Sequence, residues 1–289
     1  MTKEFIKRHS IGSSVGEKEL FAHEQMAPLF SEPITPKLRT HRSVDDTLIF
    51  ATEDVSTTHR CPGSPNPQIS ESELISVIET YARLHATFWG KTDQWAQFFQ
   101  QNACLTVSHE ATDAKTIASC QRTFLETCLP QKRAAWGDDF LPEWDQQLPA
   151  IISRWAELFT LRCENRKTLT LIQGDAHLGN IMIPRDPDHA TPLLIDWEGL
   201  CIGIGTCDIA RLLHHANFDE ATLPKFETLA LENYHSALLA NGVKDYSYED
   251  FIDDYRLSIL AYVPHSLAWG TADNVSVALC AVDRWKISS

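Results

Sequence analysis

The chain has 289 residues, 43% hydrophobic and 22% charged, so it can bury a substantial core and has the composition of an ordinary globular protein. Its 25 Lys and Arg against 39 Asp and Glu give a formal net charge of −14, which argues against nucleic acid as a partner, because such binding needs clustered basic side chains. An acidic surface is compatible with a cationic substrate, although a solvated acidic face is the commoner explanation of such a charge.

No apolar stretch reaches membrane-spanning length, and the first residues, MTKEFIKRHSIGSS, lack the apolar segment of a signal peptide. The eight cysteines are scattered without a C-x-x-C pair, which favours reduced thiols over a disulfide framework in a chain of this size. We therefore expect a cytoplasmic protein with no membrane partner. The oligomeric state cannot be predicted from these features.

The first part of the chain is predicted to run strand, helix, strand, strand, and ranges can be given for three of these elements. A short strand is expected at Glu4–Lys7, a helix at Val15–Phe30 and a buried strand at Thr47–Thr52. The segment Cys61–Pro67 follows, with three prolines and a glycine in seven residues. Because such a segment continues neither helix nor sheet, we place a lobe junction just before it.

After this break the pattern is mainly helical. Apolar residues recur at helical spacing over Glu71–Trp89, and Thr116–Leu129 and Leu148–Asn165 are further predicted helices. Between Leu169 and Trp197 the pattern changes to short apolar strands (LTLI, IMI and PLLI) separated by polar turns. From Ile209 to Tyr262 it is helical again.

The segment LTLIQGDAHLGNIMIPRDPDHATPLLIDWEGLCIGIGTCDIARLL carries the chemistry. An apolar strand leads into a polar loop with Asp175, Asn180 follows five residues later, and a hairpin returns Asp196 at the end of another apolar strand. Because strand ends hold side chains rigidly and a hairpin places its arms side by side, we expect these three side chains to converge. Two carboxylates and an amide suit Mg²⁺, with one acid left to take a proton from an attacking hydroxyl.

This segment resembles the core of the aminoglycoside-phosphotransferase and choline-kinase-like family, whose pattern is H-G-D-x-H-x-x-N followed by I-D-[WF]. The resemblance implies that Asp175 is the catalytic base, that Asn180 binds a metal ion, and that Asp196 is the metal-binding counterpart of the kinase D-F-G acid.

The same resemblance implies a supporting role for three further residues. Gln173 stands where the family has its leading His, a departure from the pattern, and together with His177 it is expected to order the loop. Asp208, in GIGTCDIA, matches the G-x-x-x-x-D-[LI]-A motif, whose acid steadies the catalytic loop in the family.

The resemblance extends upstream. Lys7, in FIKR, matches the lysine that contacts the nucleotide phosphates, and Glu19, on the following helix, matches its ion-pair partner. The segment LIFATEDVS resembles the hinge, where Glu53 to Val55 would offer backbone groups to adenine. Two alternatives stay open: Lys7 could be an exposed terminal lysine, and Glu17 or Glu24 could replace Glu19 as its partner.

Taken together, the resemblance implies an α+β, two-lobed protein-kinase-like fold, with a shortened nucleotide-binding N-lobe at residues 1–58 and a mainly helical C-lobe at 59–289. It implies a kinase that uses ATP and Mg²⁺ to phosphorylate a hydroxyl of a small-molecule acceptor. The family's first two strands and glycine-containing loop have no room before Lys7, so either the true start lies upstream of Met1 or nucleotide binds without that cover. The alternative function is a pseudokinase or ligand-binding protein that keeps the scaffold without efficient turnover.

Overall fold

The computed structural model describes residues 4–10, 13–63, 68–101, 104, 106–164, 166–188, 190–216, 218–219 and 221–287. Residues 64–67 of the predicted proline-rich break lie outside this set. Contacts between residues divide the chain into two compact units, each discontinuous in sequence. Unit 1 comprises Met1–Thr87, Gln173–Cys201 and Ala216–Gly242, and unit 2 comprises Phe88–Ile172, Ile202–His215 and Val243–Ser289. The predicted lobe boundary between residues 58 and 59 stays a prediction.

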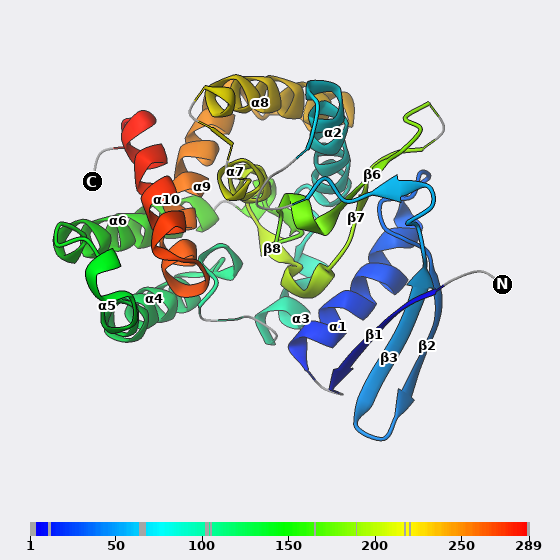
Figure 1. Cartoon of the computed structure of the whole chain (residues 1–289), viewed down its shortest axis with the longest axis horizontal. Helices are drawn as coiled ribbons and strands as arrows, with labels where there is room; N and C mark the ends of the chain where they lie inside the picture. Colours follow the sequence, from blue (N-terminus) through cyan, green and yellow to red (C-terminus); the bar gives the residue numbers. More distant parts are fainter. Residues whose placement is uncertain are drawn as a thin grey trace. The chain divides into compact units, whose positions relative to one another are not determined.

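Unit 1 begins with a three-stranded antiparallel sheet in the order β1-β3-β2, with helix α1 along one of its faces (Figure 1). Within this sheet Lys7 lies opposite Phe50 of the central strand. Ser13 caps α1 by accepting a hydrogen bond from the amide of Gly16 at 3.2 Å, which fixes where the helix begins. The bounds are β1 Glu4–Ser10, α1 Ser14–Phe21, β2 Leu38–Val44 and β3 Thr47–Glu53, and α1 continues as a π-helix (Ala22–Met26) and a 3-10 turn (Ala27–Leu29).

The central strand β3 is the one whose apolar residues were visible in the sequence, because Leu48, Phe50 and Ala51 are buried. Strand β2, in contrast, is exposed along almost its whole length and has polar side chains at most positions. A strand with no buried face has no hydrophobic period, so the sequence pattern gave no residue range for it.

The rest of unit 1 holds the hairpin that was predicted to carry the chemistry. A second antiparallel sheet has the order β4-β6-β7, and Ile181 pairs with Leu194 across the hairpin. Two long helices, α2 and α8, complete the unit, and the buried His85 ring bonds the Tyr234 hydroxyl between them at 2.7 Å. The bounds are β4 His59–Arg60, α2 Glu71–Phe88, β6 Ile181–Pro184, β7 Leu193–Leu194 and α8 Thr222–Ala240.

Unit 2 is mainly helical. Its core includes a nearly buried ion pair between α6 and α9, in which Arg162 donates to both carboxylate oxygens of Asp254 at 2.5 and 2.7 Å. Among the helices of the described residues, none has the combination of length and apolar character needed to cross a bilayer. The main helices are α3 Ala96–Gln101, α4 Ala114–Thr123, α5 Leu129–Trp136, α6 Trp144–Glu164, α7 Thr206–His215, α9 Tyr248–Trp269 and α10 Ala272–Arg284, and the strands β5 (Thr170–Ile172) and β8 (Cys201–Gly203) form a pair.

Candidate active site

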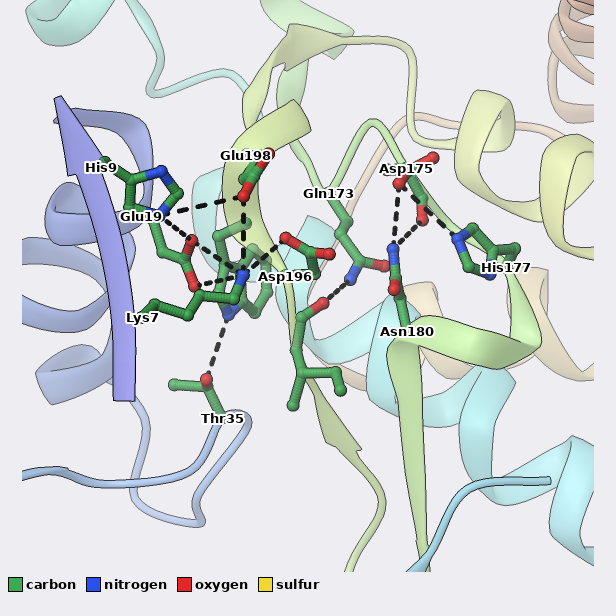
Figure 2. A network of polar contacts seen from close by, with 12 residues as sticks. Lys7, His9, Glu19, Thr35, Gln173, Asp175, His177, Asn180, Asp196 and Glu198 are labelled. Carbon is green, nitrogen blue, oxygen red and sulfur yellow. Dashed lines mark hydrogen bonds and ion pairs between the residues drawn. The ribbon is translucent and has the colours of Figure 1, made fainter. Parts of the chain in front are cut away.

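The candidate site is built entirely from residues of unit 1 and centres on the ammonium group of Lys7 (Figure 2). Lys7 Nζ lies 3.0 Å from Glu19, 2.7 Å from Asp196 Oδ1 and 3.7 Å from Glu198 Oε1. Burial alone would lower the pKa of Lys7, but Glu19 and Asp196 outweigh it and raise this pKa, so the ammonium stays charged. The lysine is therefore a fixed positive charge among three carboxylates.

Glu19 is the member of α1 that the structure brings to Lys7, and its side chain is only 3% exposed. Of the two alternative partners, Glu24 pairs with His41 at 2.8 Å, and Glu17 is exposed on the first turn of α1. Burial raises the pKa of Glu19 to about 7, and the neighbouring carboxylates add to this effect while Lys7 opposes it. Near neutral pH the Glu19 carboxyl group is therefore protonated in part of the molecules.

Asp196 follows strand β7 and adopts a left-handed backbone conformation, with φ 65° and ψ 75°. Asp is one of the few residues that adopt this region at modest cost. Its side chain is 36% exposed, and its Oδ1 accepts the hydrogen bond from Lys7.

The loop that carries Asp175 crosses the segment after Asp196 at very close range. Gly174 has φ +76°, and a Cβ placed on it would lie 2.0 Å from the carbonyl oxygen of Gly199. A Cβ on Gly199 would in turn lie 3.0 Å from the Asp175 amide nitrogen and from the Gln173 carbonyl oxygen. Glycine is therefore required at position 174, and a side chain at position 199 would also be tightly confined.

Gln173, which stands where the resemblance expects His, is fully buried and joins two segments. Its Oε1 accepts a short hydrogen bond from the Tyr81 hydroxyl on α2, and its Nε2 donates to the Ile195 carbonyl at 2.7 Å. The side-chain amide thus connects the Asp175 loop to the residue before Asp196.

Asn180 orients the carboxylate of Asp175. The Asn180 Nδ2 donates to the backbone carbonyl and to Oδ2 of Asp175, both at 3.0 Å. His177 accepts the Gly179 amide at Nδ1 over 3.0 Å, and its Nε2 lies 3.6 Å from Asp175 Oδ2. The backbone amide of Ile195 donates to the Asn180 carbonyl at 3.0 Å, so the hairpin fixes Asn180 next to the Asp196 strand.

The predicted hinge follows strand β3. The Glu53 carboxylate accepts the Lys37 amide and the Arg39 guanidinium, both at 3.1 Å. The Val55 carbonyl accepts the backbone amides of Thr58 and His59 at 3.0 and 2.8 Å. The side chain of Glu53 and the carbonyl of Val55 therefore already have partners.

A pocket of about 400 Å³ joins these parts within unit 1. Lys7, Glu19, Asn180 and Asp196 line its polar part, and the hinge residues line it as well. Its apolar lining includes Phe5, Phe50, Met182, Ile195 and Trp197.

Residues 58–240, more than half of the chain, match the phosphotransferase enzyme family. The chain belongs to this family. The predicted resemblance is thereby confirmed, as is the prediction of a small-molecule phosphotransferase that acts on a hydroxyl group. No curated protein sequence matches this phosphotransferase at a significant level.

Solved structures show the fold. The aminoglycoside phosphotransferase APH(3'')-Id from Streptomyces rimosus, in complex with ADP and streptomycin, is 18% identical with a TM-score of 0.55, covering 92% of this chain and 87% of that one. A choline/ethanolamine kinase family protein from Mesorhizobium loti is 10% identical with a TM-score of 0.56, covering 98% and 82%. An ethanolamine kinase from Plasmodium vivax is 14% identical with a TM-score of 0.52, covering 99% and 76%. The predicted α+β protein-kinase-like fold with a mainly helical C-terminal part is confirmed.

Asp208 of the phosphotransferase lies outside this cluster. It is the third residue of α7, is 1% exposed and belongs to unit 2, whereas Asp175 belongs to unit 1. Its predicted role in steadying the catalytic loop therefore stays a prediction, as do the catalytic and metal-binding roles of the other site residues.

Sequence reasoning missed His9 and Glu198 of the phosphotransferase. His9 Nε2 lies 3.3 Å from Glu19 Oε2 and 3.8 Å from Glu198 Oε1. The signal was present: His9 follows Lys7 by two residues and so shares its face of the strand, and Glu198 follows Asp196 by two residues. Nothing in the sequence indicated that α1 would meet both.

Proposed function

We propose that the protein transfers the γ-phosphoryl group of ATP, with Mg²⁺, to a hydroxyl group of a small molecule. The observation that supports this best is the pocket of about 400 Å³, because Lys7, Asn180 and Asp196 line it together with hinge residues Glu53 to Val55. A nucleoside triphosphate needs both features: charged and polar side chains for its phosphates and metal ion, and backbone polar groups for its base.

The apolar lining of the pocket suits an adenine ring. Phe5, Phe50 and Ile195 offer flat or branched apolar surface, and the hinge backbone offers polar groups beside it. Because the Val55 carbonyl accepts two amides, the group left to a base is the Val55 amide, for which no hydrogen bond occurs within the described ranges. A donor at that position pairs with a ring nitrogen of adenine.

The polar lining suits the phosphates. Lys7 is a permanently charged donor, and its contacts with Glu19 and Asp196 hold it in the pocket before a ligand arrives. On nucleotide binding Lys7 would turn from Asp196 towards the phosphate oxygens while keeping Glu19 as its support.

The donor set also fits Mg²⁺. Asn180 donates to Asp175 through its Nδ2, which leaves its Oδ1 for a metal ion. Asp196 accepts from Lys7 through Oδ1, which leaves its Oδ2. These amide and carboxylate oxygens would hold the ion, which when bound would offset the phosphate charge. The role of the chain is to keep the two oxygens in place through the Ile195–Asn180 backbone hydrogen bond.

Asp175 would accept the proton of the acceptor hydroxyl. Its carboxylate is 36% exposed, so an acceptor can reach it, and Asn180 fixes its orientation. A carboxylate fixed in this way both aligns a hydroxyl and accepts its proton as the phosphoryl group is transferred.

Screening a panel of hydroxyl-bearing amines, sugars and aminoglycosides with Mg-ATP tests the proposal, with ADP formation as the readout. We expect acceptor-dependent ADP formation that Asp175→Ala abolishes, with nucleotide affinity near wild type. Asp138→Ala, an exposed acid of unit 2, is the matched control and should keep wild-type turnover. Nucleotide binding without turnover on any acceptor would instead support the non-catalytic alternative, and full turnover of Asp175→Ala would refute its role as base.

A further inference from the structure

His9, Glu19 and Glu198 form a second cluster beside Lys7, whose three ligand-type atoms all lie within 4.8 Å of one another (Figure 2). They come from three different elements: strand β1, helix α1 and the 3-10 turn Trp197–Gly199. The nucleotide chemistry proposed above uses Glu19 only as the support of Lys7 and assigns nothing to His9 or Glu198.

His9 is held rigidly with one nitrogen directed at the two carboxylates. Its ring stacks on Phe50, with centroids 5.5 Å apart and planes 18° apart, and its side chain is only 12% exposed. The Nε2 atom is buried and makes no hydrogen bond to any residue in the described part of the chain. A buried imidazole nitrogen without a hydrogen bond carries a desolvation cost that a ligand would relieve.

The spacing of the donor atoms suits a small transition-metal ion. Ligand atoms about 2.0–2.1 Å from a tetrahedral zinc ion lie roughly 3.3–3.4 Å from one another. The observed separations from His9 Nε2 are 3.3 Å to Glu19 Oε2 and 3.8 Å to Glu198 Oε1. One imidazole with two carboxylates is a donor set that zinc accepts and that Mg²⁺, which prefers oxygen alone, does not favour.

The charge of the cluster also calls for a cation. The carboxyl groups of Glu19, Asp196 and Glu198 surround one ammonium group, that of Lys7, and no second Lys or Arg contacts them among the ion pairs of the described residues. A divalent ion on the His9 side would neutralise the excess, and it would compete with Lys7 for Glu19.

We propose that His9, Glu19 and Glu198 form a binding site for a zinc-type divalent transition-metal ion, and that the bound ion weakens nucleotide binding by taking Glu19 away from Lys7. The site is distinct from the oxygen-only Mg²⁺ position at Asn180 and Asp196. Zinc binding itself does not depend on the proposed function, so the two can fail separately.

The test is a calorimetric titration of the full chain with Zn²⁺ alone. A Cys61→Ser/Cys280→Ser background removes the two exposed thiols, which would also bind zinc. We expect one ion per chain, and at least about a tenfold loss of affinity in His9→Gln and in Glu198→Gln. His41→Gln is the matched control, because His41 pairs with Glu24 at 2.8 Å on the exposed strand β2. It should leave zinc affinity unchanged.

A second readout uses ATP affinity in the same background. Zinc should weaken ATP binding in the background protein and in His41→Gln, but not in Glu198→Gln, whose exposed side chain makes it the variant least prone to misfold. Unchanged zinc affinity in both His9→Gln and Glu198→Gln, with thermal unfolding like the background, would overturn the site. Zinc that binds at the site while ATP affinity stays constant would overturn the competition with Lys7.

Discussion

Replacing Gly174 by alanine tests whether the close crossing of the two acid-bearing segments governs stability. The new Cβ would lie 2.0 Å from the Gly199 carbonyl oxygen, and the residue would have to keep φ +76°. The left-handed backbone costs an L-residue about 1–2 kcal/mol, and forcing an extra methyl into a packed site costs about 1–3 kcal/mol more. Gly174→Ala should therefore lower the free energy of unfolding by about 2–5 kcal/mol.

The matched control is Gly242→Ala, also in unit 1. Gly242 has φ +95° but no atom within 4 Å of an added Cβ, so only the backbone cost applies, about 1–2 kcal/mol. Urea unfolding of both variants, followed by circular dichroism, measures the difference. Equal losses in the two variants would refute the reasoning, because the crossing at Gly199 would then contribute nothing beyond backbone strain.

Three further changes test the site. Asp196→Asn should weaken ATP binding more in the presence of Mg²⁺ than in its absence, because the amide keeps the shape but loses the charge that faces the ion. Calorimetric titrations measure both affinities, and equal losses would show that Asp196 is not a metal ligand. Glu19 should make stability pH-dependent: its pKa rises from an ordinary 4.5 to about 7 in the folded state, so its stabilisation is complete below pH 4.5 and is lost as pH rises through 7, about 3 kcal/mol in all. Unfolding curves of Glu19→Gln should lack this decline, and a parallel decline in both proteins would assign it to another group. Tyr81→Phe removes the donor to the buried Gln173 and should lower the free energy of unfolding in urea by about 1–2 kcal/mol. Tyr248→Phe, at an exposed tyrosine, should change it very little. The same loss in both variants would contradict the role of the Tyr81 hydroxyl.

Two of the predicted elements show most clearly how burial appears in the sequence. Strand β3 and helix α2 bury regularly spaced apolar side chains, and the catalytic-loop motif has an order and spacing that leave little freedom. The exposed strand β2 has no such period, and the helices α3 and α10 were not predicted. A local pattern reports burial, which explains the miss at β2, but α10 buries Val275, Ala278 and Val282 at helical spacing, so its signal was present and overlooked.

In the site, the sequence predicted the residues that one short segment brings together, but not those that meet through the packing of distant segments. Asn180 and Asp196 flank the two arms of one hairpin, and Asp175 lies in the loop just before it, so local geometry predicts that the three converge. The choice of Glu19 over Glu17 and Glu24 depends on how α1 packs, which no local rule gives. The approach of His9 to Glu198 needs the full fold, because 189 residues separate them in sequence.

Under the proposed function, the position of β1 at the edge of its sheet would make nucleotide affinity depend on local order. Among the described strands, β1 pairs only with β3, and Phe5 and Ile6 are 58% and 48% exposed, so one ladder and the side-chain contacts of Lys7 hold this strand. Edge elements of this kind open at lower free energy than the core. The apparent dissociation constant for ATP is then the intrinsic constant divided by the fraction of molecules in which β1 is docked. By the same linkage a bound nucleotide protects the amides of β1 from hydrogen exchange, so affinity can be tuned by substitutions on this strand that never touch the ligand.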